Sequence, residues 1–266
     1  MRRSLTELAN EHGSDKGTVG PSLDWGAHNY TDVYEAYLEP LRELPINLLE
    51  IGLGVTGDRW RSKIVHGRNT GGASVKMWRD YFANGRIYGI DVNEAAELDG
   101  ERVRTFVADQ GELDDLRALT EATGGIRFDV IVDDGSHRPD HQQVALGYLF
   151  DFLDPGGLYF IEDLQANGYG DGARGRQACE DVRNTRSLLR AIRAGDDPPR
   201  PHALPDPSRL AGEIEHVGLH VPRVVPVADE ARGLLRRQRG QRRRGRRAIA
   251  FEPDSERLGV LRKRRR

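Results

Sequence analysis

The sequence contains little cysteine and no long apolar run. Cys179 is the single cysteine among 266 residues, so no disulfide framework can form within the chain. A reducing, cytoplasmic setting is therefore expected. Two arginines near the N-terminus are not followed by an apolar stretch, so no secretory signal is expected. No segment approaches the roughly 18 apolar residues of a membrane span, so no membrane association is expected.

Aromatic residues are also scarce, and charge is unevenly distributed. From residue 232 to the end there are 14 arginines and one lysine against three acids, a formal charge of +12. Since the whole chain carries −2, the remainder carries −14. The segment "RRQRGQRRRGRR" (residues 236–247) has no apolar periodicity, and we expect it to be mobile and solvated. Such a tail can neutralise phosphates, but Phe251 is the only aromatic residue after Tyr169, so a nucleic-acid partner is not expected.

From residue 46 onward, apolar runs alternate with helical patterns. The apolar runs are continuous rather than alternating with polar residues, which is typical of parallel strands that are covered on both faces. We therefore predict a Rossmann-like α/β fold with a mostly parallel sheet and helices on both faces. The predicted strands cover residues 46–54, 86–91, 103–109, 128–134 and 156–163, and the predicted helices cover residues 71–82, 112–122 and 141–153.

Three regions are expected along the chain. Residues 1–45 form a helical N-terminal lid segment, in which Ser4 and Glu7 have the spacing of a capping box. Residues 46–230 form the main α/β domain, and residues 231–266 form the arginine-rich tail. The C-terminal predictions are a helix near residues 177–193, a strand pair in residues 216–228, and one short strand at residues 248–253.

Each predicted strand ends in glycine or polar residues, and ligands of open parallel sheets bind at the carboxyl ends of the strands. The loop "LLEIGLGVTGD" is glycine-rich but lacks the third glycine of a dinucleotide-binding motif. The next predicted helix starts about 15 residues later, so no helix N-terminus follows to bind a diphosphate. S-adenosylmethionine (SAM), which has no phosphate, fits this loop better. The candidate cofactor-binding residues at these strand ends are Glu50, Gly52, Gly54, Asp91, Asp109 and Gln110.

Carboxylates follow two successive strands of the predicted sheet. Asp134 ends one, and Glu162 and Asp163 end the next. If these strands are neighbours, a divalent cation would relieve the repulsion between the carboxylates, and ligands that are all oxygen favour Mg²⁺, Ca²⁺ or Mn²⁺ over Zn²⁺. His137 follows Asp134 by three residues and is a candidate general base, although a histidine in such a turn is more often a cap or a surface residue. The alternative for the stretch "IVDDGSH" is a strand that ends in an ordinary polar turn.

These segments together resemble a known family. "LLEIGLG", "RIYGIDV", "FDVIVDDGSH" and "PGGLYFIEDLQ", with "ANEHGSDKG" and "HNYTDVYEAYLEPLR" before them, resemble the metal-dependent class I O-methyltransferases of natural-product sugars. The resemblance implies a seven-stranded fold, SAM and Mg²⁺ as cofactors, and a glycoside or nucleotide-sugar acceptor in antibiotic biosynthesis, with a homo-oligomer expected.

By position, the resemblance implies roles for individual residues. Asp134, Glu162 and Asp163 would bind the metal, with His137 as general base. The "HNYT" segment would close over the cofactor, which makes His28, Tyr30 and Thr31 further candidates.

Two alternatives stay open. Another small-molecule acceptor is compatible with the same fold, because acceptor pockets lie in loops and fold alone does not determine substrate. A nucleic-acid-binding protein that uses the arginine-rich tail is the alternative from a different class. Pro222 and Pro226 interrupt the last predicted strands, so the sequence does not establish how the sheet is completed.

Overall fold

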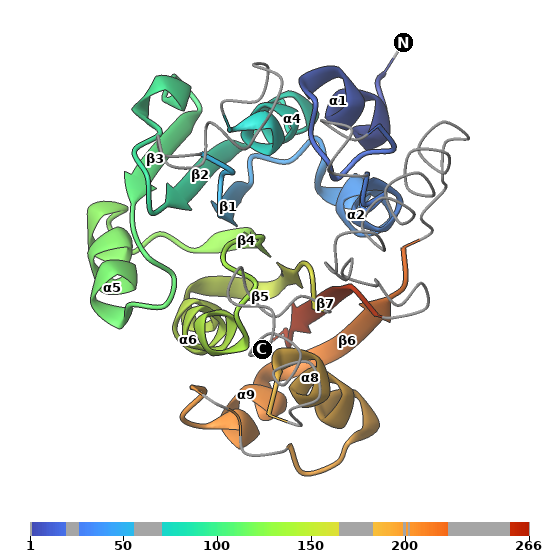
Figure 1. Ribbon diagram of the computed structural model, residues 1–266, viewed down its shortest axis with the longest axis vertical. Coiled ribbons are helices and arrows are strands. Elements are labelled where there is room, and N and C mark those ends of the chain that lie inside the picture. The colour runs from blue at the N-terminus through green and yellow to red at the C-terminus, as the bar shows by residue number, and fades with distance from the viewer. Residues whose placement is uncertain are drawn as a thin grey trace, which may run out of the picture.

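The computed structural model describes residues 2–19, 27–55, 71–164, 183–198, 201, 203–222 and 256–265. These residues form one sheet of seven strands in the order β3-β2-β1-β4-β5-β7-β6 (Figure 1). The strands are β1 Asn47–Ile51, β2 Arg86–Asp91, β3 Val103–Val107, β4 Phe128–Asp133, β5 Leu153–Ile161, β6 Ile214–His220 and β7 Leu258–Lys263.

Five of the seven strands form one parallel ladder. β1 pairs with β2 on one side and with β4 on the other, and the parallel ladder continues to β3 and β5. β7 is antiparallel to both β5 and β6. The predicted fold class is therefore confirmed. Because β1, β4 and β5 are adjacent, the polar residues that follow them lie together at one edge of the sheet.

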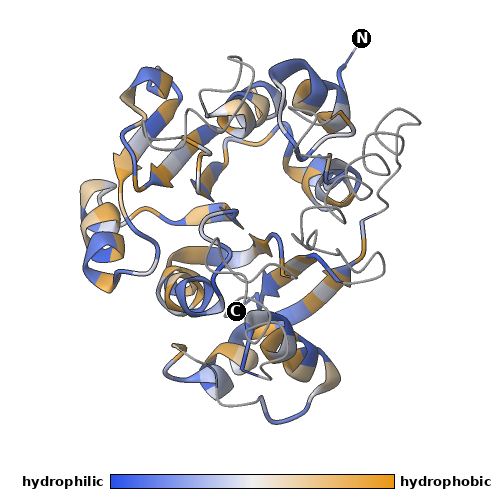
Figure 2. Cartoon of the chain, in the orientation of Figure 1, coloured by the Kyte–Doolittle hydropathy of each residue, from blue (hydrophilic) through white to orange (hydrophobic). Residues whose placement is uncertain are grey.

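Helices cover both faces of this sheet. One face packs against α1 Leu5–His12, α2 Thr31–Leu38 and α4 Ala73–Tyr81, and the other against α5 Leu113–Ala122, α6 Pro139–Leu149, α8 Thr185–Ala194 and α9 Pro207–Glu213. Three short 3₁₀ helices lie at Glu39–Leu41, Ala96–Leu98 and Phe150–Phe152. Hydrophobic residues predominate on the strands and on the inner sides of the helices (Figure 2), as two buried cores require.

The N-terminal segment packs directly on the sheet. In α1 the predicted capping box is present, because Ser4 Oγ accepts from the Glu7 N–H and Glu7 Oε2 accepts from the Ser4 N–H. Tyr34 of α2 lies in the same core as Trp78 and Phe160, and its ring centroid is 5.1 Å from that of Trp78 and 4.6 Å from that of Phe160. The described residues before β1 therefore share the core of the main domain.

The C-terminal part differs from the sequence-based expectation. Within the described residues, the helix expected near 177–193 is α8, which begins at Thr185 after an Asn184 cap. The expected strand pair is represented by the single strand β6, and residues 223–228 and 248–253 lie outside the described residues. The partner of β6 is β7, which comes from the predicted basic tail. Leu258, Val260 and Leu261 form a short buried apolar run in β7 between Arg257 and Arg262, and the basic composition concealed this run.

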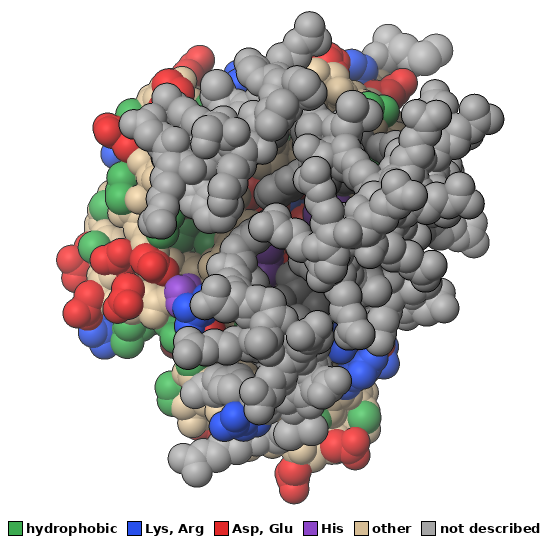
Figure 3. All heavy atoms as spheres, in the orientation of Figure 1, with side chains coloured by type: hydrophobic (Ala, Val, Ile, Leu, Met, Phe, Trp, Pro, Cys, Tyr) green, Lys and Arg blue, Asp and Glu red, His purple; other side chains and the backbone are tan. Residues whose placement is uncertain are grey.

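The acidic character of the body is visible on the surface. Acidic side chains gather over α5, whose first turn carries Asp114 and Asp115 (Figure 3). The described part of the tail is not a free basic arm. Lys263 is buried and donates hydrogen bonds to the carbonyl oxygens of Phe150 (2.7 Å) and Leu153 (3.0 Å). No helix among the described residues is long and apolar enough to cross a membrane.

Candidate active site

The turn after β4 brings a possible metal-binding group together. Asp134, His137 and Asp163 each present one ligand atom, and these atoms lie within 4.8 Å of one another. His137 Nε2 lies 3.7 Å from Asp163 Oδ2. Two strand ends that are 28 residues apart in sequence therefore meet, as the sequence predicted, because β4 and β5 are neighbours.

Three non-glycine residues of the described chain have positive φ, and all lie in this region. They are Asn29 (53°), His137 (56°) and Asp163 (51°). The left-handed conformation is unfavourable for residues with a Cβ and persists where surrounding contacts enforce it, often at functional sites. Here it directs two members of the proposed site, His137 and Asp163, toward each other.

Asp133, by contrast, has a structural role. It is fully buried at the end of β4, and both of its carboxylate oxygens accept from Gln110 Nε2, at 3.0 and 3.1 Å. Burial raises the pKa of Asp133 to about 6. Gln110 Oε1 in turn accepts from the Ser136 N–H at 2.7 Å. Gln110 therefore braces the turn after β4 with both of its polar atoms, and its predicted cofactor contact would have to compete with these bonds.

Glu162 is buried beside an unexpected partner. Its Oε1 accepts a hydrogen bond from Tyr34 and lies 2.9 Å from Lys16 Nζ, whereas its Oε2 is buried with no hydrogen-bond partner among the described residues. Burial raises the pKa of Glu162 well above its usual value, and Asp134 adds to this effect. A buried carboxylate oxygen without a partner beside Asp134 and Asp163 fits an oxygen-ligated divalent cation.

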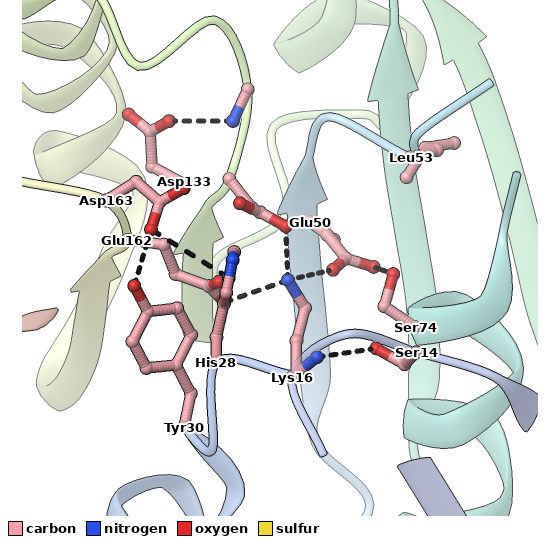
Figure 4. Close-up of polar contacts among 12 residues, drawn as sticks. Ser14, Lys16, His28, Tyr30, Glu50, Leu53, Ser74, Asp133, Glu162 and Asp163 are labelled. Carbon is pink, nitrogen blue, oxygen red and sulfur yellow. Dashed lines mark hydrogen bonds and ion pairs between the residues drawn. The ribbon is translucent and has the colours of Figure 1, made fainter. Parts of the chain in front are cut away.

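Lys16 is the functional candidate that the sequence analysis missed. Its side chain is fully buried, and its Nζ contacts Asp134 Oδ2, Glu162 Oε1 and, at 3.6 Å, Glu50 Oε1 (Figure 4). Burial alone would lower the pKa of Lys16, but these three carboxylates together raise it well above its usual value. In the sequence it lies in "GSDKG", which reads as an ordinary polar turn.

The "HNYT" segment contacts Asp163. Tyr30 Oη donates to Asp163 Oδ1 at 2.5 Å, and His28 Nδ1 lies 3.9 Å from the same oxygen (Figure 4). Burial raises the pKa of Tyr30 well above its usual value, and Asp163 adds to this, so the phenol stays a donor. Thr31, in contrast, shares a hydrogen bond with Thr6 at 2.8 Å, which holds α1 and α2 together.

The loop after β1 packs against the turn after β4. Gly52 has φ 83°, and a Cβ there would lie 2.3 Å from the Asp134 carbonyl oxygen, so only glycine fits. Gly54 has φ 64°, and no atom lies within 4 Å of the position that a Cβ would take there. Glu50 is fully buried, and its Oε2 accepts from Ser74 Oγ at 2.9 Å. Burial raises the pKa of Glu50 to about 7, against the opposing effect of Lys16.

Asp91 and Asp109 occupy the next two strand ends. Asp91 Oδ2 accepts from the Leu53 N–H at 3.0 Å, so it fixes the loop after β1, and its Oδ1 accepts from the Asn93 N–H at 2.9 Å. Asp109 is partly exposed and accepts from the Gly111 N–H at 2.8 Å. These predicted cofactor residues therefore lie at the same edge of the sheet as Asp134, His137 and Asp163.

The fold and this edge define the class of protein. A seven-stranded sheet in the order β3-β2-β1-β4-β5-β7-β6, with a glycine loop after β1 and acids after β2, β4 and β5, is the class I methyltransferase fold. A solved structure agrees: the MycE methyltransferase of the mycinamycin pathway, in complex with Mg, SAH and mycinamycin VI, matches with a TM-score of 0.62. The match has 24% identity and covers 99% of this chain and 55% of that one.

Curated relatives narrow the class. The chain is 36% identical over 234 residues to the 8-demethyl-8-(2-methoxy-alpha-L-rhamnosyl)-tetracenomycin-C 3'-O-methyltransferase of Streptomyces olivaceus. This alignment covers 86% of this chain and 54% of the relative. It is 32% identical over 213 residues to the mycinamicin VI 2''-O-methyltransferase of Micromonospora griseorubida, and this alignment covers 77% of this chain and 49% of the relative. No family profile matches the chain.

The chain thus spans about half the length of these relatives. The chain therefore belongs to the family of sugar O-methyltransferases of antibiotic pathways, and the resemblance that the sequence motifs indicated is confirmed.

Proposed function

We propose that this chain is a SAM- and Mg²⁺-dependent O-methyltransferase domain that acts on a sugar hydroxyl of a glycosylated natural product. The observation that carries the proposal is the group Asp134, His137 and Asp163, which lies beside the glycine loop of a class I methyltransferase fold. The chain spans about half the length of these curated relatives, so its activity and its acceptor are both part of the proposal.

The cofactor side is supported by the loop after β1. SAM supplies an activated methyl group on sulfur, and the protein needs only to hold it in line with the acceptor oxygen. The Leu53 N–H is already fixed by Asp91, and Gly52 keeps this loop against the turn that carries Asp134. We assign cofactor binding to this loop together with Asp91 and Asp109.

His137 is the proposed general base. In the reaction the acceptor oxygen forms a bond to the methyl carbon while the carbon–sulfur bond breaks, and the hydroxyl proton moves to the His137 Nε2. The carboxylate of Asp163, 3.7 Å from that nitrogen, stabilises the imidazolium that results. Tyr30 holds Asp163 in place through its hydrogen bond at 2.5 Å.

The metal would be held by Asp134, Asp163 and Glu162. Mg²⁺ supplies positive charge for the acceptor oxygen, and its preference for oxygen ligands fits these carboxylates. The unpartnered Glu162 Oε2 is the structural support for including Glu162. The described part of the basic tail lies in β7, so no observation favours the nucleic-acid alternative.

The acceptor class follows from the relatives. The tetracenomycin relative is named for a rhamnosyl substrate, and the mycinamicin relative for a 2''-O position. We therefore expect a deoxysugar that is already attached to its aglycone, in preference to a free nucleotide-sugar.

A methyl-transfer assay tests this function. The purified chain is incubated with methyl-labelled SAM and a panel of rhamnosylated polyketides, nucleotide-sugars, catechols and RNA, with Mg²⁺ or with EDTA. We expect methyl ether formation on a glycoside, with the rate reduced by EDTA and by Asp134→Asn. Transfer that is insensitive to EDTA would remove the metal from the proposal, and methylation of a catechol alone would replace the sugar acceptor.

A further inference from the structure

Lys16 contacts carboxylates from three adjacent strands. Glu50 is in β1, Asp134 follows β4 and Glu162 follows β5, and Lys16 Nζ reaches one oxygen of each. Nζ donates to Asp134 Oδ2 and lies 2.9 Å from Glu162 Oε1, whereas Glu50 Oε1, at 3.6 Å, is an ion-pair partner without a hydrogen bond. The other oxygens stay available for other partners. Glu50 Oε2 accepts from Ser74, and Glu162 Oε2 has no hydrogen-bond partner among the described residues.

The backbone of Lys16 is held as firmly as its side chain. Its carbonyl oxygen accepts from the Tyr30 N–H at 2.9 Å and from the Thr31 N–H at 3.1 Å, where α2 begins. Tyr30 and Tyr34 then reach back to Asp163 and Glu162. Lys16 therefore cannot move without disturbing the segment that closes over the strand ends.

The three carboxylates belong to different halves of the site. Glu50 precedes the glycine loop on the cofactor side, whereas Asp134 and Glu162 lie on the metal side. Within the part of the chain that the structure describes, Lys16 contacts carboxylates on the cofactor side and on the metal side at once. A compact ammonium suits this position better than the planar, larger guanidinium of arginine, because the position is fully buried.

We propose that Lys16 is a positioning residue that couples the cofactor loop to the metal-binding carboxylates, so that occupation of one half favours binding in the other. This inference rests on the proposed function. Binding of either ligand orders carboxylates that share one ammonium group, so the second ligand has less ordering left to do. By linkage, each ligand strengthens the other by the same factor.

The test measures Mn²⁺ binding to the full chain by calorimetry, with and without saturating S-adenosylhomocysteine. Mn²⁺ serves as the probe for the oxygen-ligated site. For the wild-type chain we expect saturating S-adenosylhomocysteine to lower the dissociation constant of Mn²⁺ by about fivefold or more. In Lys16→Met the ratio of the two dissociation constants falls to about one. This ratio distinguishes coupling from a general loss of structure.

Two further variants keep the test decisive. Lys263→Met removes a second buried lysine, which is bound to carbonyl oxygens away from the carboxylates, and should lower the melting temperature while it preserves the ratio. If Lys16→Met does not fold, Glu50→Gln serves instead. It can keep the bond to Ser74 but loses its charge toward Lys16, so the ratio should again fall to about one.

The outcomes separate the two proposals. The coupling role is overturned if folded Lys16→Met or Glu50→Gln has the same ratio of Mn²⁺ dissociation constants as the wild-type chain. It is also overturned if this ratio is about one in the wild-type chain. Either result leaves the proposed function standing. If the wild-type chain binds neither Mn²⁺ nor S-adenosylhomocysteine, the proposed function fails, and the coupling fails with it.

Discussion

His137 has an unfavourable backbone conformation and lies beside a carboxylate of the proposed site. Its φ of 56° places it in the left-handed region, and its Nε2 lies beside the Asp163 carboxylate. A surface histidine in a helix-entry turn would have no reason to hold this conformation, which costs on the order of 1–3 kcal/mol. The strained conformation therefore favours the general-base role over the cap or surface residue that a histidine in such a turn more often is.

Replacing His137 by Gln should affect turnover and leave cofactor binding intact. We expect kcat to fall by about 10²- to 10⁴-fold, since the variant lacks the base that accepts the hydroxyl proton. The dissociation constant of S-adenosylhomocysteine should change by less than about threefold, because the contacts assigned to the cofactor lie elsewhere. Initial rates with the identified acceptor and calorimetric titration measure the two quantities.

His141 provides the matched control. It lies in α6 with its Nδ1 3.6 Å from Asp109 Oδ1, on the other side of the turn. Because Asp109 is assigned to the cofactor, the comparison is made at saturating SAM, where His141→Gln should keep kcat within about threefold of the wild-type value if proton transfer is the function of His137 alone. Equal losses in the two variants would assign the effect to the turn and not to the base.

The sequence was informative for some of these residues and silent for others. Asp134 and Asp163 could be grouped in advance, because parallel strands place their carboxyl ends at one edge. Lys16 could not, since its contacts depend on how residues 14–19 fold over the sheet, 34 or more positions before the nearest of its partners. Polar turns and buried ion-pair sites have the same composition, so only tertiary structure separates them.

At the scale of elements, α1 supports the segment that carries Lys16. Its apolar residues Leu5 and Leu8 are buried against the core that includes α4, and its C-terminal Gly13 lies three residues before Lys16. His12 Nε2 also pairs with Asp80 of α4 at 2.8 Å. The position of Lys16 therefore depends on a helix of only two turns.

The capping box is a measurable part of that support. Ser4→Ala removes the acceptor for the Glu7 N–H, and we expect the free energy of unfolding to fall by about 1 kcal/mol. Ser208→Ala, at an exposed position of α9, is the control and should change it by less than about 0.5 kcal/mol. Urea titration followed by circular dichroism measures both. Equal effects would show that the cap contributes no stability of its own.

The elements that the sequence predicted well are those with a strong local pattern. β1, β2, β4 and the second half of β5 are runs of buried, mostly apolar residues, and α1 has its capping residues next to it. β7 was not recognised because Arg257 and Arg262 flank its short apolar core, and the next residues are all basic. Its strand identity comes from pairing with β5, about 100 residues earlier, which no local window can detect.

For the whole molecule, β7 connects two parts of the sheet. It lies between β5, which precedes the carboxylates Glu162 and Asp163, and the edge strand β6. The Arg257 carbonyl, just before β7, also accepts from the Leu164 N–H at 2.9 Å, next to the proposed site. The C-terminal strand therefore supports the end of β5, and the stability of the fold and the geometry of the site are linked.

Leu261→Ala tests this dependence. Leu261 is fully buried in β7 and its Cα pairs with that of Tyr159 in β5. Removing its side chain leaves a cavity between the strand and the helices that cover it. We expect the free energy of unfolding to fall by about 2–5 kcal/mol, with the larger values if the surrounding residues do not relax into the cavity. Val221→Ala, at a position that is 44% exposed, should cost less than about 0.5 kcal/mol. Urea unfolding monitored by tryptophan fluorescence compares the two variants, and a loss for Leu261→Ala no larger than that for Val221→Ala would mean that the sheet is stable without close packing of β7.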